Sequence, residues 1–429
     1  MIEADLVVTG AAEVVTLAGP PPRLGKTLAE PAVIPQGALA ARGDRLVFVG
    51  SAAELDRQVR LRPGGRRLEA AGGTVLPGFV DPHTHLPFAG WREGEFVARL
   101  RGDTYESIAA AGGGIRATVA ATRRATLEEL EALTLARLDR MLLHGTTTVE
   151  AKSGYGLTAA DEIKQLEAIR RAASAHAVTV VPTFLGAHVV PQERRSDRAG
   201  YVRELTEAMI PEVARRGLAR ACDVFVDGGA FTPEEAETIL GAARSAGLAI
   251  RVHADQRSDG GGARLAARLG ALSADHLEHV DDDGIARLAA AGTVAILLPG
   301  AAHFLRDAHD PPARRMIDAG VALALATDFN PGTCPTESVA VILSLACLRY
   351  GLHPSEAIGA ATINAAHALG LGGECGSLEP GKRADLQVAA VPNHLHLAYH
   401  FGVNHCRAVV KSGRVVVEDG RLTPLARGG

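Results

Sequence analysis

Eight short apolar segments, each followed by a longer segment of helical period, recur between residues 74 and 327. The apolar segments are 74–80, 146–150, 179–185, 222–226, 249–253, 273–278, 293–298 and 321–327. The clearest helical segments are 127–143, 160–175, 233–246 and 260–269, several of which follow a Ser, Thr or Asp that can cap a helix. This alternation predicts parallel strands joined by helices, and eight such units are the number in an α/β protein of the (β/α)8 TIM-barrel type.

The two ends of the chain have a different pattern. Apolar runs at 5–9 and 45–50 alternate with Gly, Pro and Asp turns, and similar runs at 384–388 and 408–417 follow the central region. These patterns are typical of β-hairpins, and chain termini often lie close together. We therefore expect residues 1–73 and 378–429 to form one composite β domain, and residues 74–377 to form the barrel.

The composition limits the classes of protein to which this chain can belong. Its 429 residues are enough for a barrel of about 250 residues with an accessory domain. Its net charge of −4 does not favour nucleic acid as a partner. No stretch of 18 uninterrupted apolar residues occurs, and the N-terminus lacks the features of a signal peptide. The five cysteines are scattered without a Cys-x-x-Cys pair. We expect a cytoplasmic protein with reduced thiols and no contact with a membrane.

Histidines and carboxylates lie at or near the ends of most of the predicted strands. The residues in question are His83, His85, Glu150, His188, His253, Asp275, His276 and Asp328. Barrel enzymes carry their chemistry at the C-terminal ends of the strands, so these side chains are expected at one mouth of the barrel.

Four of these residues form a candidate metal site. In a strand, side chains alternate between faces, so His83 and His85 point the same way and can share one ion. The pair alone is equally consistent with two structural histidines. With His253 and Asp328 it makes three imidazoles and one carboxylate, a set that suits zinc or iron and not magnesium or calcium. A metal ion of this kind lowers the pKa of bound water to about 7, and Asp328 can accept the proton.

The run Phe79-Val80-Asp81-Pro82-His83-Thr84-His85, with His253, His276 and Asp328, resembles the amidohydrolase superfamily over nearly the whole chain. The resemblance implies a metal-dependent barrel flanked by a small β-sandwich built from both termini. Many members bind two ions, bridged by a carboxylated lysine or a glutamate on the fourth strand. This chain has no lysine between Lys164 and Lys382, and its fourth strand runs into Asp227. We therefore expect one ion, with Asp227 the only nearby carboxylate that could hold a second.

Narrower sequence blocks resemble one branch of the superfamily. These blocks are 82–93, 112–115, 152–157, 183–188, 273–277 and 326–332. Members of this branch hydrolyse the cyclic amide C–N bond of 4-imidazolone-5-propanoate to N-formimino-L-glutamate in histidine degradation, and they are commonly homodimers. The resemblance therefore implies a small-molecule substrate and a homodimeric assembly.

The same resemblance implies roles for individual residues. It makes Arg92 and Tyr155 binders of the substrate, and the planar fork of Arg92 suits the propionate carboxylate. His188 and His276 are expected at the ring or its carbonyl oxygen. The remaining substrate-binding residues, expected around the carboxylate, are Asn330, Gly332 and Thr333. The alternatives are a solvated surface charge for Arg92 and core histidines for His188 and His276.

Gln256 departs from the pattern, because a glutamate is common at this position in the family. An amide cannot act as a base at neutral pH, so Gln256 is expected to hydrogen-bond the substrate ring. Proton transfer is then expected through the catalytic residues Asp328 and His276, with His276 polarising the carbonyl and Asp328 returning a proton to the leaving nitrogen. His276→Ala is expected to lower turnover by about a hundredfold or more.

Two other interpretations remain. A deaminase of a nucleobase-like heterocycle could use the same metal and histidines, although Gln256 and Arg92 argue against it. A non-catalytic barrel is disfavoured because all four ligand positions are filled. Outside the barrel mouth, a cluster of histidines near the C-terminus is expected to pack over the barrel or at a subunit contact; its members are His394, His396, His400 and His405.

Overall fold

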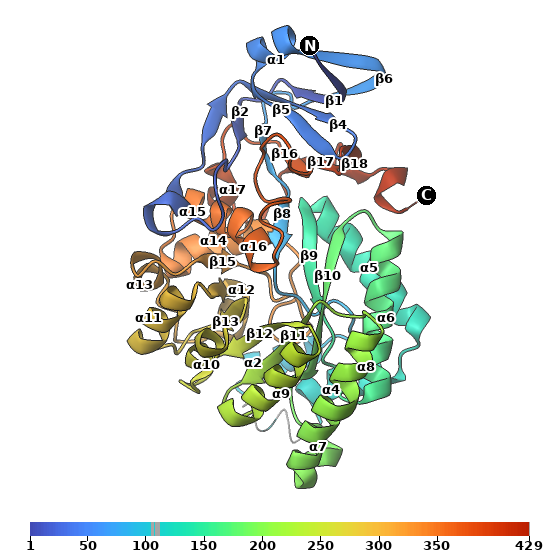
Figure 1. The fold of residues 1–429 in the computed structure, drawn as a ribbon, viewed down its shortest axis with the longest axis vertical. Helices are drawn as coiled ribbons and strands as arrows, with labels where there is room; N and C mark the ends of the chain where they lie inside the picture. The colour runs from blue at the N-terminus through green and yellow to red at the C-terminus, as the bar shows by residue number, and fades with distance from the viewer. Residues whose placement is uncertain (104–106, 108–111, 429) are drawn as a thin grey trace.

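The computed structural model describes residues 1–103, 107 and 112–428, and its centre is a sheet of eight parallel strands in which chain neighbours are also sheet neighbours (Figure 1). The strands are β8 (Phe79–Asp81), β9 (Thr146–Lys152), β10 (Thr179–Ala187), β11 (Ala221–Val226), β12 (Ala249–Ala254), β13 (Ser273–His276), β14 (Val294–Leu297) and β15 (Leu323–Leu325). The expected α/β fold of the (β/α)8 type is confirmed.

Backbone hydrogen bonds past the ends of the first and last strands bring the two edges of this sheet together. The N–H of Asp328 donates to the carbonyl of His83, and the N–H of His85 donates to the carbonyl of Phe329, both at 3.0 Å. The segments that follow β8 and β15 therefore run side by side. As a result, His83 and His85 lie next to Asp328, although more than 240 residues separate them along the chain.

Helices follow each strand on the outside of the sheet. They are α2 (Glu93–Leu100), α4 (Ile115–Arg124), α5 (Leu127–Leu143), α6 (Ala159–Ala175), α7 (Arg198–Glu204), α8 (Ile210–Arg215), α9 (Pro233–Ser245), α10 (Gly262–Leu269), α11 (Asp282–Ala291), α12 (Pro299–Leu305), α13 (Ala313–Asp318), α14 (Val339–Tyr350), α15 (Pro354–Ala360) and α16 (Ile363–Ala368). Thr126 and Thr232 cap α5 and α9, each accepting the N–H of a glutamate three residues later. The four clearest expected helices match α5, α6, α9 and α10 within two residues.

Two further sheets lie together above the barrel in Figure 1; one is built from the N-terminal region alone, and the other combines strands from both ends of the chain. The four-stranded sheet contains β1 (Ile2–Thr9), β4 (Gly37–Arg42), β5 (Arg45–Ser51) and β6 (Val59–Glu69). The seven-stranded sheet contains β2 (Glu13–Val15), β3 (Val33–Pro35), β7 (Thr74–Pro77), β16 (Leu386–Ala389), β17 (Cys406–Lys411), β18 (Arg414–Glu418) and β19 (Arg421–Leu422). Leu6 and Leu39 of the first sheet share an apolar cluster with Val388 and Val410 of the second. The expected pairing of the two ends is therefore present.

The segment 74–80, expected to be one barrel strand, forms two strands in different sheets. β7 pairs with β2 and β16, whereas β8 pairs with β9. Gly78 lies between them, and a Cβ atom there would come within 2.2 Å of Thr147 Cγ2. Both halves are fully buried and largely apolar, so the sequence does not show where the chain passes from one sheet to the other. The chain enters the barrel sheet at Phe79, not at Thr74 as expected.

The C-terminal histidine segment packs between the two parts of the fold. His394 Nδ1 lies 2.9 Å from Oε1 of Glu13, the first residue of β2, and its Nε2 lies 3.2 Å from the hydroxyl of Ser355 in α15. The following helix α17 (His396–Tyr399) packs against α14. Tyr399 is 80% exposed. The segment therefore covers helices of the barrel, as expected.

The remaining short helices lie in connections or near the C-terminus. They are η1 (Gly25–Ala29), α1 (Ala52–Gln58), η2 (Gln192–Asp197), η3 (Leu205–Met209) and η4 (Pro424–Ala426). All five cysteines are free thiols, and four of them are buried. Among the described residues, none of the helices combines the length and the apolar character needed to cross a membrane.

Candidate active site

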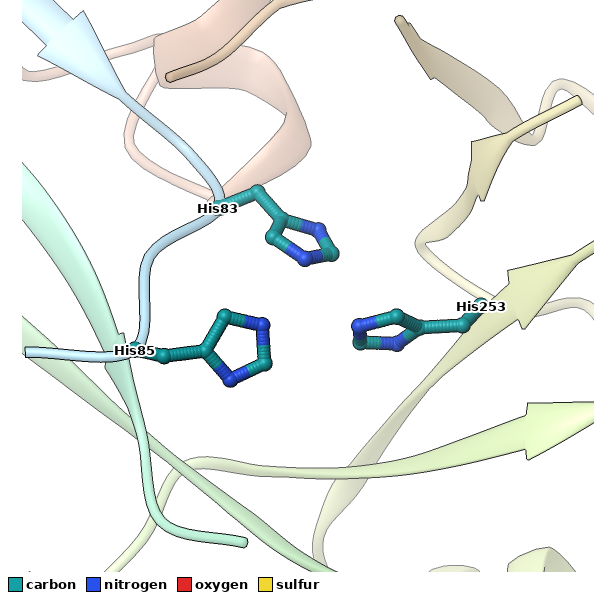
Figure 2. A group of neighbouring side chains, drawn as sticks. All are labelled: His83, His85 and His253. Atoms are coloured by element: carbon teal, nitrogen blue, oxygen red, sulfur yellow. The ribbon is translucent and has the colours of Figure 1, made fainter. Parts of the chain in front are cut away.

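Three histidine rings meet at the mouth of the barrel. His83 and His85 lie in the segment after β8, and His253 lies in β12. Figure 2 shows the three rings turned toward one common space. One ring nitrogen from each lies within 4.8 Å of the others, and the three residues are at most 3% exposed. The rings of His83 and His85 thus share one cluster, although β8 ends at Asp81 and neither histidine lies in a strand as expected.

Two buried carboxylates behind the cluster orient two of these rings. The Nδ1 atom of His83 lies 2.6 Å from Asp275 Oδ2, and that of His253 lies 3.0 Å from Asp223 Oδ2. Contacts of this kind fix a ring and leave its Nε2 atom available to a metal. The Nε2 atoms of His83 and His253 are buried and have no hydrogen-bond partner in the described part of the chain. His253 Nδ1 also has none, because Asp223 lies close to it without hydrogen-bond geometry.

Asp328 lies beside this cluster. Its Oδ1 atom is 3.4 Å from His85 Nε2 and 3.6 Å from His83 Nε2, and its Oδ2 atom accepts a hydrogen bond from the Thr333 hydroxyl at 3.2 Å. Burial opposes ionisation of Asp328, but the hydrogen bond from His85 and the nearby histidines hold its pKa below the usual value. The four expected ligand residues are thus adjacent.

The chemistry of this cluster fits a metal ion. Burial lowers the pKa of both His83 and His85, which favours neutral imidazole, the form that binds metals. A buried polar atom without a partner costs about 1–3 kcal/mol, and a metal ion would satisfy the unpartnered Nε2 atoms. Three imidazoles with one carboxylate form a donor set suited to zinc or iron.

A buried lysine below the cluster escaped the sequence analysis. Lys152 Nζ lies 2.8 Å from Glu150 Oε1 and 2.9 Å from Asp223 Oδ2, and all three side chains are fully buried. Glu150 Oε2 also accepts the N–H of Thr84, between the two histidines. The sequence held one signal for this pair, which is the two-residue spacing of Glu150 and Lys152. Residues two apart on a strand share a face, and charged side chains in a buried strand require partners.

His276, at the end of β13, lies next to the same cluster. Its ring centroid is 5.4 Å from that of His253 and 5.7 Å from that of His83. Its Nδ1 atom is 3.8 Å from Glu278 Oε2. Burial lowers the pKa of His276, but Glu278 and Asp328 outweigh this effect and raise it above the usual value. This imidazole therefore protonates more readily than His83 or His85.

Tyr155 and His188 lie on the other side of His85. The rings of His188 and His85 are stacked at 5.3 Å between centroids, and the ring of Tyr155 lies 5.3 Å from His188 and 5.7 Å from His85. The carboxylate of Glu162 holds the loop of Tyr155 by accepting three backbone N–H bonds, from Gly154, Gly156 and Leu157. Burial raises the pKa of Tyr155, so its hydroxyl stays neutral.

Arg92 lies against the loop that follows β15. A Cβ atom on Gly332 would come within 2.0 Å of an Arg92 guanidinium nitrogen, so any larger residue there would displace the guanidinium group. Glu95 Oε2 accepts hydrogen bonds from Nε and a terminal nitrogen of Arg92, at 3.0 and 2.7 Å. The Arg92 side chain is 13% exposed. Its environment is thus that of an enclosed, paired cation, not of a solvated surface charge.

Asn330 uses its amide group within the same loop. Its nitrogen donates to the carbonyl of Asp328 and to the Thr333 hydroxyl, and its oxygen accepts the N–H groups of Gly332 and Thr333. These four bonds use the full hydrogen-bonding capacity of an amide. Asn330 therefore fixes the shape of the loop and the position of Thr333 beside Asp328.

Gln256 and Asp227 lie just beyond the C-terminal ends of β12 and β11. Gln256 is buried and follows β12 by two residues. Asp227 accepts hydrogen bonds from the backbone N–H groups of Gly228 and Arg257 and from the Ser258 hydroxyl. Asp227 is thus engaged by its own surrounding loops, and the carboxylate of β11 that faces a histidine of the cluster is Asp223.

Comparisons with known proteins agree with this geometry. The model of the amidohydrolase family matches residues 74–416. Imidazolonepropionase of Symbiobacterium thermophilum is 54% identical over 423 residues, covering 98% of this chain and 99% of the relative. A crystal structure of a triazine hydrolase variant has a TM-score of 0.75 at 19% identity, covering 98% of this chain and 96% of the other. An adenosine deaminase from Xanthomonas campestris with bound zinc has a TM-score of 0.69 at 20% identity, covering 99% and 95%.

The two kinds of similarity carry different weight. Likeness at 19–20% identity shows the fold alone, whereas identity of 54% over nearly the full length of both proteins shows the family. This chain belongs to the amidohydrolase family, within its imidazolonepropionase branch.

Proposed function

We propose that this chain hydrolyses the cyclic amide C–N bond of 4-imidazolone-5-propanoate to N-formimino-L-glutamate, a step of histidine degradation. The observation that carries the proposal is one barrel mouth that combines the cluster of His83, His85 and His253 with an enclosed Arg92. The first feature suits hydrolysis, and the second suits a carboxylate-bearing substrate. The relative from Symbiobacterium thermophilum is named for this activity.

One zinc or iron ion is the cofactor in this proposal, held by His83, His85, His253 and Asp328. Such an ion supplies a water with a pKa near 7 and polarises a carbonyl oxygen. Asp328 accepts the proton of the attacking water, and the Thr333 hydroxyl holds its Oδ2 atom in place for this task. Asp275 and Asp223 keep the rings of His83 and His253 aimed at one point.

Substrate binding is assigned to the residues around this centre. Arg92 pairs with the propionate carboxylate, beside Gly332 and Thr333 in a loop that Asn330 shapes. Tyr155 and His188 border the ring on the side of His85, and Gln256 donates or accepts one hydrogen bond to it. His276 polarises the amide carbonyl. Asp328 then returns its proton to the ring nitrogen that leaves.

The experiment is a turnover assay with purified, metal-loaded protein. We expect loss of the imidazolone absorbance, formation of N-formimino-L-glutamate detected by mass spectrometry, and no release of ammonia. Purines and pyrimidines serve as substrates for the competing deaminase function. Release of ammonia from one of these bases, with no turnover of imidazolone propanoate, would replace the proposed function by deamination.

The proposal extends to the setting of the enzyme. A small anionic substrate and the absence of a basic surplus favour a metabolic role without nucleic acid. We place the enzyme in the cytoplasm as a homodimer.

A further inference from the structure

The backbone after β13 adopts an unusual conformation next to the proposed active site. His276 and Leu277 have φ angles of 83° and 72°, in the left-handed region that side chains other than glycine rarely adopt. Such a conformation is strained for a residue with a side chain and persists only where its surroundings hold it. The N–H of Leu277 donates to the backbone carbonyl of Ala254 at 3.0 Å, and that of His279 donates to the backbone carbonyl of Asp255 at 2.8 Å. These bonds to β12 and the residue after it stabilise the turn.

The turn places the Glu278 carboxylate against the ring of His276. Glu278 Oε2 lies 3.8 Å from His276 Nδ1, and both side chains are at most 3% exposed. Neither atom has a hydrogen-bond partner within the residues that the structure describes. Buried polar atoms normally find partners, so an unpartnered acceptor facing an unpartnered ring nitrogen points to a contact that forms in another state of the enzyme.

We propose that Glu278 is a positioning residue for His276. When substrate occupies the site, the Glu278 carboxylate accepts a hydrogen bond from Nδ1–H of the doubly protonated His276 ring, and this contact keeps Nε2–H directed at the substrate carbonyl. This inference rests on the proposed function. A separation of 3.8 Å is too long for a hydrogen bond, but contacts of catalytic groups often shorten only in the substrate complex. A carboxylate behind an imidazole fixes its orientation and stabilises the imidazolium form, in which both ring nitrogens donate.

The contact between Glu278 and His276 matters more in this chain because position 256 is a glutamine. The amide of Gln256 can neither take up nor release a proton at neutral pH. His276 therefore has to act without help from an ionisable side chain at position 256. In this proposal the negative charge beside His276 comes from Glu278, which faces Nδ1 and does not contact the substrate.

The first test compares Glu278→Gln with the unchanged enzyme. We expect kcat to fall by about 10- to 100-fold, with KM and metal content changed little, because the variant keeps the shape of the side chain and loses the anion. Glu356→Gln is the matched control, since Glu356 is also a buried glutamate but pairs with Arg314 on the outer helices. This control is expected to lose stability and keep kcat. Equal kcat for Glu278→Gln and the unchanged enzyme would overturn the proposal.

A double-mutant cycle separates positioning from a general structural role. If Glu278 acts through His276, the double variant His276→Ala/Glu278→Gln is expected to be no slower than His276→Ala alone. Losses in kcat that multiply would show that the two residues act independently, which contradicts the proposal.

A spectroscopic test does not depend on turnover. Zinc-loaded protein with 15N-labelled histidine is examined by NMR with and without imidazole-4-propanoate, a carboxylate-bearing analogue that cannot be hydrolysed. We expect an Nδ1–H signal of His276, assigned by its loss in His276→Ala, to shift on addition of the analogue and not to shift in Glu278→Gln. If the unchanged enzyme fails to hydrolyse imidazolone propanoate, the proposed function falls. The same shift in both proteins would refute the role of Glu278.

Discussion

The Asp275 carboxylate lies 2.6 Å from His83 Nδ1, where both side chains are fully buried. Asp275 belongs to β13 and His83 follows β8, so the contact crosses the interior of the barrel. This contact occupies Nδ1 of His83, so Nε2 is the ring nitrogen that faces the histidine cluster. A metal ligand of this kind depends on a residue that never touches the metal.

Asp275→Asn is expected to weaken metal binding without unfolding the protein. Asparagine keeps the shape of the side chain but offers a weaker and less directional acceptor to His83, and loss of such a partner costs about 10- to 100-fold in metal affinity. Competition with a chromophoric chelator measures the affinity for zinc. Asp281→Asn, at the N-cap of α11, is the control and keeps the affinity, because asparagine caps helices as well as aspartate does. Unchanged affinity in Asp275→Asn would show that His83 needs no support from Asp275.

Lys152→Met is expected to destabilise the fold. The change leaves Glu150 and Asp223 buried without their cation, and breaking a buried ion pair costs about 3–5 kcal/mol. Urea unfolding of the metal-free protein measures the free energy directly. In the control Lys164→Met, a partly exposed pair with Asp161 is lost, which costs about 1 kcal/mol or less. Similar losses in the two variants would rule out a special role for the buried lysine.

Arg92→Met is expected to raise KM by about 10- to 100-fold and to change kcat less, because a charged hydrogen bond contributes about 1.5–3 kcal/mol. Arg92→Lys should recover only part of the loss, since an ammonium group lacks the planar fork. Steady-state kinetics with the propionate substrate and with its neutral amide separate the charge effect. If Arg92→Met raises KM equally for both substrates, Arg92 does not bind the carboxylate.

The pair of Arg314 and Glu356 predicts a pH dependence of stability. Burial raises the pKa of Glu356, but hydrogen bonds from Arg314 and from the His353 backbone outweigh it, so the pKa lies below its usual 4.5. A lowered folded-state pKa stabilises the fold above the unfolded value, and this contribution is lost as the pH falls through the folded value. The difference in unfolding free energy between the unchanged protein and Glu356→Gln should be constant above pH 5 or so and shrink below pH 4.5. A difference that grows toward acid would contradict this sign.

Much of the fold was predictable because its signals are local. Alternating apolar and amphipathic segments indicated the barrel, and Thr126 and Thr232 indicated the starts of two helices. The exception was the run around Gly78, where two buried strands of different sheets form one apolar stretch. Only tertiary contacts decide where such a run changes sheets.

The site residues that could be predicted are those at or just after the C-terminal ends of the barrel strands. His83, His85, His253 and Asp328 met that criterion, and the structure brings them together. Asp223 was missed because it lies within β11, and Lys152 was missed although it is the last residue of β9. In both cases a single sequence does not show which charged side chains face inward and meet. Their partners come from other strands and are set by the geometry of the closed barrel.

Metal titration of the stripped enzyme, with product analysis at each step, tests the central claim most directly. Apo-protein is reloaded with increasing equivalents of zinc or iron, and turnover of 4-imidazolone-5-propanoate is measured at each point. We predict that activity rises linearly and stops rising at one equivalent per chain, with N-formimino-L-glutamate as the product. A plateau at two equivalents, or full activity in the metal-free protein, would contradict a hydrolase with a single metal ion at His83, His85, His253 and Asp328.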